Sequence, residues 1–163
     1  SASEPAMEQA LDALPCLLKR GQRLMGLDLG TKTIGVAVSD AMFTIATPVE
    51  TIARKKFTAD AEKLAALAKK RDAGALLYGL PVNMDGTEGP RCQATREFAR
   101  EFAKRHPLPY AFWDERLSTA AVQRMLVEEA DMSRKRRAEV VDRAAAAYIL
   151  QGALDALAMR RGR

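Results

Sequence analysis

The order of predicted elements along the chain is the feature that most constrains its fold. Three extended segments come first, at 24–29, 33–39 and 47–52, and only the turn residues 30–32 separate the first two. Short apolar strands then alternate with helical patterns through the rest of the chain. Consecutive strands favour an antiparallel meander, whereas alternation favours parallel strands joined by right-handed crossovers. We therefore predict an α/β protein with a mixed five-stranded sheet, three antiparallel strands followed by parallel βα units, flanked by helices.

The second half of the chain shows regular apolar periodicity. It is interrupted by four consecutive cations at 134–137, which are interpreted as a solvated loop before a final long helix from Glu139 onward. The other predicted elements are a helix with Phe57, Ala61, Leu64, Ala65 and Ala68 on one face, a strand at 75–80, a helix with Thr95, Phe98, Ala99 and Phe102 on one face, a strand at 110–113, and a helix through Val122, Met125 and Leu126 that Ser118 or Thr119 can cap. These helices supply apolar faces to cover the sheet.

The length of the chain predicts one domain. A chain of 163 residues is long enough for a real core and too short for two large lobes. The regular pattern occupies residues 23–158. Residues 1–22 are interpreted as an N-terminal extension lying on the domain, because Pro15 interrupts any long helix there. Residues 159–163 form a basic tail.

The composition predicts a cytoplasmic protein with no membrane partner. No apolar run approaches the roughly 18 residues that a membrane helix needs, and the first residues lack the layout of a secretion signal. The two distant cysteines, Cys16 and Cys92, form no disulfide framework and no paired-thiolate metal motif. His106 is the only histidine, which excludes a zinc site built from histidines.

The charge of the chain favours an anionic partner. The net charge is +5 with a sequence pI near 9.4, and net charge indicates partners rather than fold. The run Arg134, Lys135, Arg136 and Arg137 is a candidate contact for the phosphate backbone of a nucleic acid. The alternative is that these cations are simply solvated.

The first candidate site residue is Asp28, which lies inside an apolar strand. The alternation of the strand places it on the face opposite Leu27 and Leu29. Burying a charged carboxylate there costs on the order of several kcal/mol of folding free energy, unless the carboxylate is paired or bound to a metal. The functional interpretation is a metal or phosphate ligand, and the alternative is a hydrogen-bonded aspartate at a strand end.

Two further positions carry candidate acids. Asp114 and Glu115 directly follow an apolar strand, and ligands bind at the carboxyl ends of parallel strands. Neighbouring residues there point to opposite sides, so one of the two is expected to face the site, the alternative being a solvated pair with Arg116 as counterion. Asp142 heads a helical stripe with Ala146 and Ile149, although an aspartate in a first helical turn also suits the helix dipole.

Carboxylates that converge without histidine or thiolate suit a hard cation such as Mg²⁺ or Mn²⁺. Two such ions about 3.5–4 Å apart can activate water and stabilise the leaving oxygen of a phosphodiester. Uncovered carboxylates so close together would repel each other, so metal binding would also relieve strain. The residues thus favour a metal-dependent phosphodiester hydrolase.

Four motifs, in order and at compatible spacings, resemble the YqgF/RuvX family from about Leu24 to Leu154. They are Gly26-Leu27-Asp28-Leu29-Gly30-Thr31-Lys32-Thr33-Ile34-Gly35-Val36-Ala37-Val38-Ser39-Asp40, Gly79-Leu80-Pro81-Val82-Asn83-Met84-Asp85-Gly86, Asp114-Glu115-Arg116-Leu117-Ser118-Thr119 and Val141-Asp142-Arg143-Ala144-Ala145. The resemblance implies a ribonuclease H-like fold related to Holliday-junction resolvases. It also implies a nuclease of branched DNA or of the 5′ end of pre-16S ribosomal RNA, and the family favours the latter.

The resemblance assigns roles to the acids. It implies that Asp28 bridges the metals, that a carboxylate of Asp114–Glu115 completes the site, with Glu115 preferred, and that Asp142 binds from the last helix. Many ribonuclease H-like nucleases carry an acid at the end of the fourth strand, where this chain has Gly79-Leu80-Pro81. The second metal is the part of the mechanism that this difference puts in question. Lys32, Asn83 and Arg116 are candidate substrate contacts, with structural roles as alternatives.

Two other classes of function remain open from the sequence. The segment 27–32 also resembles the first phosphate motif of actin-like kinases and chaperone ATPases, but those proteins need two lobes that this chain cannot hold. A nucleic-acid-binding protein with vestigial acids is the other class. A junction resolvase would ordinarily act as a homodimer, since it must cut two strands symmetrically, and Met125, Met132 and the N-terminal leucines are candidates for exposed apolar surface.

Overall fold

The computed structural model describes residues 7–118 and 134–161, and the side chains of 7–117 and 144–160. One five-stranded sheet lies at its centre, with strand order β3-β2-β1-β4-β5. The elements are η1 Leu11–Ala13, α1 Leu14–Leu17, β1 Arg23–Leu29, β2 Thr33–Ser39, β3 Ala46–Ala53, α2 Phe57–Lys70, β4 Ala73–Leu80, α3 Pro90–Arg105, β5 Tyr110–Asp114, η2 Glu115–Ser118 and α5 Arg134–Arg161. The predicted mixed sheet is confirmed.

The pairing of the strands follows the predicted change of rhythm. β2 pairs antiparallel with both β1 and β3, whereas β4 pairs parallel with β1 and with β5. β1 and β4 therefore lie in the interior of the sheet, and every residue of β4 is buried. Pro48 lies on the edge strand β3, opposite a register shift in β2, which agrees with the rule that proline is tolerated at edges.

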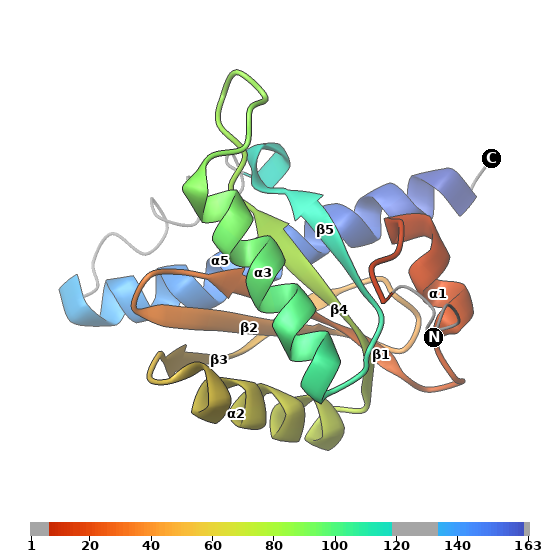
Figure 1. Cartoon of the computed structure of the whole chain (residues 1–163). Helices are drawn as coiled ribbons and strands as arrows, with labels where there is room; N and C mark the ends of the chain where they lie inside the picture. Colours follow the sequence, from red (N-terminus) through yellow and green to blue (C-terminus); the bar gives the residue numbers. More distant parts are fainter. Residues whose placement is uncertain (1–6, 119–133, 162–163) are drawn as a thin grey trace, which may run out of the picture.

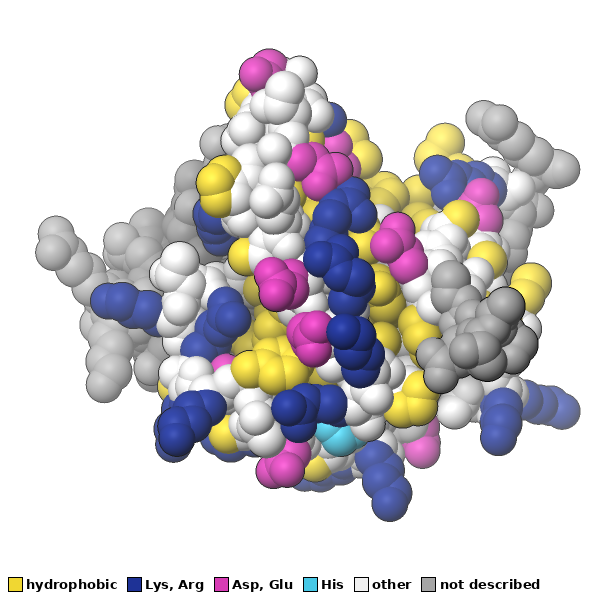
Figure 2. All heavy atoms as spheres, in the orientation of Figure 1, with side chains coloured by type: hydrophobic (Ala, Val, Ile, Leu, Met, Phe, Trp, Pro, Cys, Tyr) yellow, Lys and Arg dark blue, Asp and Glu magenta, His cyan; other side chains and the backbone are white. Residues whose placement is uncertain are grey.

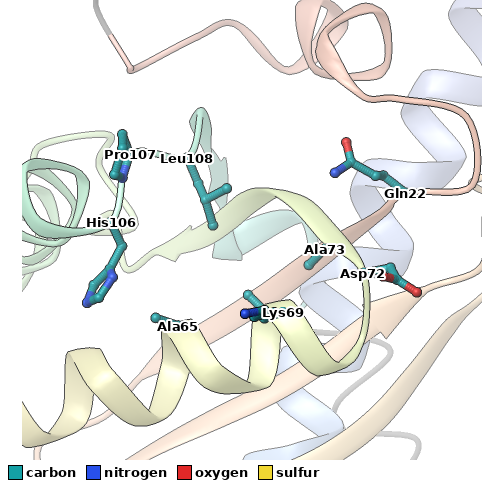
Figure 3. A pocket seen from close by; sticks show the side chains of 9 residues that line it. Gln22, Ala65, Lys69, Asp72, Ala73, His106, Pro107 and Leu108 are labelled. Atoms are coloured by element: carbon teal, nitrogen blue, oxygen red, sulfur yellow. The ribbon is translucent and has the colours of Figure 1, made fainter.

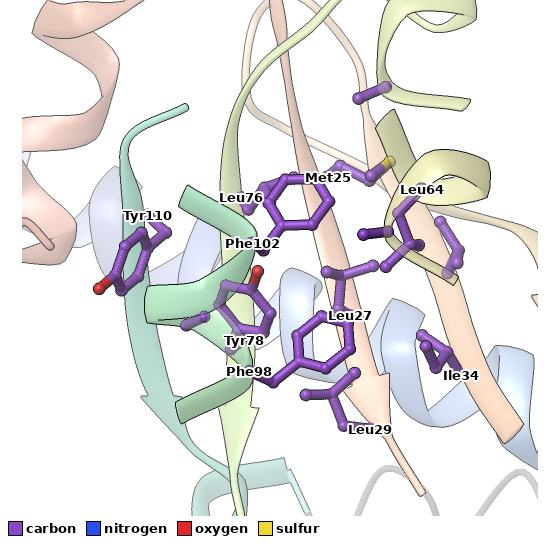
Figure 4. Packing of buried hydrophobic residues seen from close by; sticks show 14 of the residues in the cluster. Met25, Leu27, Leu29, Ile34, Leu64, Leu76, Tyr78, Phe98, Phe102 and Tyr110 are labelled. Carbon is purple, nitrogen blue, oxygen red and sulfur yellow. The ribbon is translucent and has the colours of Figure 1, made fainter. Parts of the chain in front are cut away.

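Two apolar layers enclose the sheet (Figure 1). α2 and α3 cover one face, where Phe98 and Phe102 of α3 pack against Leu27 and Tyr78 of the strands (Figure 4). α5 covers the other face, where Ile149 and its neighbours join a second cluster with residues of β1 and β4. The strand residues therefore alternate between the two clusters, as the period of a β-strand requires.

The described part of the predicted N-terminal extension packs against the sheet and contributes to the core. Leu11 and Leu14, two of the leucines expected as candidates for exposed apolar surface, are instead buried in the cluster beneath α5, whereas Leu17 is exposed. The backbone N–H of Gln9 donates to the carbonyl of Tyr110 at 2.7 Å, which fixes the segment beside the start of β5. No helix in the described part of the chain combines the length and the apolar composition needed to cross a membrane.

The start of the last helix differs from the prediction. α5 begins by Arg134 rather than at Glu139, so the run 134–137 is helical and the interpretation as a loop was wrong. Repulsion among the four cations was given more weight than the good intrinsic helix propensity of lysine and arginine. α5 also continues to Arg161, which includes three residues of the predicted basic tail. The predicted helix through Val122, Met125 and Leu126, and the exposed surface expected at Met125 and Met132, lie outside the described residues.

Candidate active site

The candidate active site lies at the carboxyl ends of the parallel strands β1, β4 and β5. Asp28 is the penultimate residue of β1, and Glu115 directly follows Asp114, the last residue of β5. β4 lies between these two strands, so a carboxyl group from each side has to reach over it. The carboxyl ends of parallel strands are where α/β proteins bind their ligands.

Asp28 and Glu115 meet at this edge. A hydrogen bond joins their carboxyl groups, which requires a proton on one of them. Burial, the negative charge of Asp28 and this hydrogen bond together raise the pKa of Glu115 from 4.5 to about 7. The pair is therefore an acidic site that holds a proton close to neutral pH, as the predicted repulsion between convergent carboxylates requires.

The absence of a side chain at Gly79 makes room for Glu115. A Cβ at Gly79 would lie 2.8 Å from Oε1 of Glu115 and 2.5 Å from Cδ1 of Ile149. The Glu115 side chain thus occupies the space above β4, where a side chain from the end of that strand would otherwise stand. This packing explains in physical terms why the chain has glycine where many ribonuclease H-like nucleases carry an acid.

The Gly79→Ala variant is expected to lower nuclease activity about ten- to a hundredfold, because its new methyl group would displace the Glu115 carboxylate by a fraction of an ångström or more. Both atoms that the methyl meets are ends of flexible side chains, so unfolding in urea should change by no more than about 1–3 kcal/mol. Gly89→Ala is the matched control, since its Cβ would meet nothing closer than 3.5 Å. Equal activities of the two variants would contradict the packing argument.

Asp114 is engaged elsewhere. Its carboxylate accepts hydrogen bonds from Nε and Nη2 of Arg116, the shortest at 2.6 Å, and from the backbone N–H of Arg116 at 2.9 Å. These contacts lower the pKa of Asp114. The structure therefore brings Glu115, and not its neighbour, to Asp28, whereas the sequence left the choice open.

The third acid, Asp142, lies in α5, and its side chain is outside the described residues. The C-terminal end of α5 lies near η1, because Arg160 of α5 pairs with Asp12 of η1. The N-terminal end of α5 therefore points toward the other edge of the sheet, where β1 ends. A Cβ at Gly26 would meet the carbonyl of Ala146 at 3.3 Å. Asp28 lies two residues beyond Gly26, a shift of roughly 6–7 Å along the strand. Asp142 lies about one helical turn before Ala146, a shift of roughly 6 Å along the helix. The backbone at 142 therefore lies on the same side as Asp28.

A hollow of about 500 Å³ opens beside Asp28, lined by Gly30, Thr31, Lys32, Thr33 and Arg91 as well as Asp28. Lys32 was predicted as a substrate contact, whereas Arg91 was missed. Arg91 lies in the first turn of α3, and its charge opposes the rise in the pKa of Glu115. The signal that could have identified it is positional, because helices that follow parallel strands begin at the edge where ligands bind.

Asn83 and Arg116 hold the loop after β4. The side-chain amide of Asn83 donates to the hydroxyl of Thr87 at 3.1 Å, and its backbone N–H donates to the Thr87 carbonyl at 2.9 Å. Arg116 Nη1 donates to the carbonyls of Asn83 and Met84, both at 3.4 Å. These contacts favour the structural alternative for both residues. The side chains of Arg134, Lys135, Arg136 and Arg137 lie outside the described part of α5.

A second hollow, of about 370 Å³, lies at the opposite edge of the sheet, where the strands begin (Figure 3). Lys69, Asp72 and His106 are the ionisable groups among its lining residues. A single acid is a poor ligand set for a hard cation, so the edge with Asp28 and Glu115 is the better candidate. Within residues 7–117 and 144–160, no three His, Cys, Asp or Glu side chains gather as a metal site. The predicted third ligand, Asp142, lies outside these residues.

A model of the family described as "RuvX: Holliday junction resolvase" matches residues 22–156. The chain belongs to this family. It is 63% identical over 156 residues, 96% of the chain and 94% of the relative, to a protein of Rhodospirillum rubrum named "Putative pre-16S rRNA nuclease". A protein of Paramagnetospirillum magneticum with the same name is 64% identical, over 85% of this chain and 88% of its own length.

Solved structures support the same fold. RuvC of T. thermophilus in complex with a Holliday junction substrate matches with a TM-score of 0.53 at 13% identity, covering 86% of this chain and 96% of that one. A second Thermus thermophilus RuvC structure matches with a TM-score of 0.50 at 10% identity, covering 86% and 97%. The ribonuclease H-like fold expected from the sequence is thereby confirmed, and the family is one of nucleases.

Proposed function

We propose that this chain is a metal-dependent endonuclease that hydrolyses phosphodiester bonds in the 5′-end maturation of pre-16S ribosomal RNA. The observation that carries the proposal is the pair of carboxyl groups, Asp28 and Glu115, held together at the carboxyl ends of parallel strands. The relatives named as pre-16S rRNA nucleases, 63% and 64% identical, support the choice of substrate.

The residues at this edge fit a hard divalent cation, Mg²⁺ or Mn²⁺. Asp28 and Glu115 offer only carboxylate oxygens, and burial, followed by the negative charge of Asp28, raises the pKa of Glu115. A cation bound between the two groups would offset this cost. Asp142 would be the third ligand, and the course of the α5 backbone past Gly26 supports this choice. When bound, the metal would lower the pKa of a water molecule and offset charge on the reacting phosphate.

The protein side chains would bind and orient the substrate around this site. Lys32 lines the hollow beside Asp28 and offers its ammonium group to a phosphate. The run Arg134–Arg137 at the start of α5 is proposed to contact the backbone of the nucleic acid farther away. Arg116 is held by Asp114, so we assign it to the support of the loop after β4.

A second candidate function is the resolution of Holliday junctions. The description of the matching family model names this activity, and the fold is that of RuvC. A resolvase would need two copies of the chain to cut two strands symmetrically. Cleavage of a four-way junction at paired positions by a homodimer would support this candidate.

The proposal is tested by incubating the purified chain with a precursor carrying the 5′ end of 16S rRNA and, separately, with a four-way DNA junction. We expect cleavage of the RNA at a defined position with Mg²⁺ or Mn²⁺, and loss of cleavage in excess EDTA. Junction cleavage without RNA cleavage would favour the second candidate. Binding of either substrate without cleavage under all metal conditions would instead indicate a nucleic-acid-binding protein with vestigial acids.

A further inference from the structure

Three cations from separate parts of the chain, Lys32, Arg54 and Arg91, lie around the turn Gly30–Thr31, next to Asp28. Lys32 follows this turn, Arg54 follows β3, and Arg91 lies in the first turn of α3. Two hollows share the turn and Arg91 as lining. The hollow of about 500 Å³ contains Asp28 and Lys32, and a smaller one of about 90 Å³ contains Arg54. The acidic pair is therefore continuous with a positively charged recess.

Arg54 is fixed in this recess. Its Nη1 donates to the carbonyl of Gly30 at 2.6 Å, and its backbone N–H donates to the carbonyl of Lys32 at 2.8 Å. Its guanidinium group lies 5.7 Å from the centre of the Phe98 ring, within the range of a cation–π contact. These contacts hold the turn and leave most of the five N–H donors of the guanidinium group for other acceptors.

Arg91 is not tied in the same way. Among the side chains described, those of residues 7–117 and 144–160, its guanidinium group makes no ion pair or hydrogen bond, although its charge acts on Glu115. Arg96, on the same helix, shows the contrast, because it is bound by Glu88 at 2.8 Å. A counterion for the acids would be expected to pair with them. Arg91 instead lines both hollows and is an exposed residue.

We infer that Arg91, together with Lys32 and the turn Gly30–Thr31, binds a backbone phosphate of the nucleic acid next to the scissile one. The planar fork of arginine matches two phosphate oxygens, and the ammonium group of Lys32 adds a point charge on the other side. The inference rests on the proposed function and names the surface that aligns the substrate strand across Asp28 and Glu115. Arg91 is thus a substrate-positioning residue rather than a residue that reacts.

The cations beyond the recess indicate where the strand would continue. Lys55 and Lys56 are exposed directly after Arg54, at the start of α2. Figure 2 shows further Lys and Arg side chains in a column over the face that α3 covers, with Asp and Glu side chains close beside them. That face is mixed in charge, because Glu97 and Glu101 share α3 with Arg100 and Lys104. At the recess, Lys32, Arg54 and Arg91 outnumber the single lining acid, Asp28, so the recess is the better phosphate surface.

The test compares Arg91→Gln and Arg91→Lys with Arg100→Gln, a matched control at an exposed arginine of the same helix. Binding of the RNA precursor is measured in the Asp28→Asn background over a range of salt concentrations, and cleavage is measured without that substitution. Arg91→Gln should weaken binding about tenfold at roughly physiological salt and reduce the log-log salt slope by about 0.7, the value for one single-stranded phosphate contact. Arg91→Lys should restore the slope.

The kinetic readout separates positioning from damage to the fold. Arg91→Gln should raise KM about tenfold with a smaller change in kcat. This is expected because Arg91 would contact the phosphate equally in the bound substrate and in the transition state, so its loss weakens both to the same extent. An unchanged salt slope with an active wild-type enzyme would overturn the inference and leave the proposed nuclease standing. A slope reduced equally by Arg100→Gln would also overturn it. A wild-type chain that neither binds nor cleaves nucleic acid would overturn both proposals.

Discussion

Asp28→Asn is expected to abolish cleavage while leaving nucleic-acid binding within about twofold of the wild type. The substitution keeps the shape of the side chain but removes the negative charge that a hard cation needs. Loss even of residues that support a metal ligand costs about 10- to 100-fold, so loss of a ligand should lower the cleavage rate by at least about a hundredfold. The rate of precursor cleavage with saturating Mg²⁺ and a gel-shift binding assay give the two readouts.

The matched control for Asp28→Asn is Asp114→Asn, at the acid that faces away. Because Asp114 is paired with Arg116 rather than with Asp28, its loss should cost far less activity than the loss of Asp28 or of Glu115. Equal cleavage by the Asp28→Asn variant and the wild type would refute the metal mechanism. Equal losses in the Asp28 and Asp114 variants would refute the choice of Glu115 as the second acid.

Glu115→Gln is expected to stabilise the metal-free protein at alkaline pH. The pKa of Glu115 is raised from 4.5 to about 7 in the folded chain, so the folded state binds the proton more tightly than the unfolded state between these values. Stability contributed by this group is therefore lost as pH rises from about 4.5 to 7, and the loss is complete above 7. It amounts to up to about 3 kcal/mol, which the glutamine variant should not lose.

Urea unfolding in EDTA at several pH values between 5 and 8 measures this effect. The difference in the free energy of unfolding between Glu115→Gln and the wild type should be small at pH 5 and largest at pH 8. Glu97→Gln, at an exposed glutamate of α3, is the control and should show no such trend. Mg²⁺ at pH 8 should stabilise the wild type more than Glu115→Gln. A difference that does not vary with pH would mean that the two carboxyl groups do not interact as the structure indicates.

The fold was predictable because each element carries its own periodic signal. The helix face of Thr95, Phe98, Ala99 and Phe102 predicted from the sequence is the buried face of α3. The antiparallel and parallel halves of the sheet followed from the order of elements alone. The start of α5 was not predictable in the same way, because four adjacent cations give no apolar stripe from which to read helical phase.

The candidate site was predictable only in part. Asp28 stood out because a carboxylate in an apolar strand needs a partner, and the structure supplies Glu115 as that partner. Which of Asp114 and Glu115 faces Asp28 depends on the 3-10 helix η2 and on the pairing of Asp114 with Arg116. Neither feature produces a periodic pattern in the sequence. Arg91 carried only a positional signal, its place in the first turn of a helix that follows a parallel strand, and the sequence does not show that the turn between β1 and β2 lies beside it in space.

The contact between Gly79 and Glu115 couples two positions far apart in the chain, because both draw on the same space. A side chain at residue 79 would take up part of the volume above β4 that the carboxyl group of residue 115 fills, so that carboxyl group would have to shift. An acid at the end of the fourth strand and an acid after the fifth are then alternative routes to the same point. Sequence searches that require the acid at one fixed strand would overlook chains of this kind, because the position that matters is defined in space.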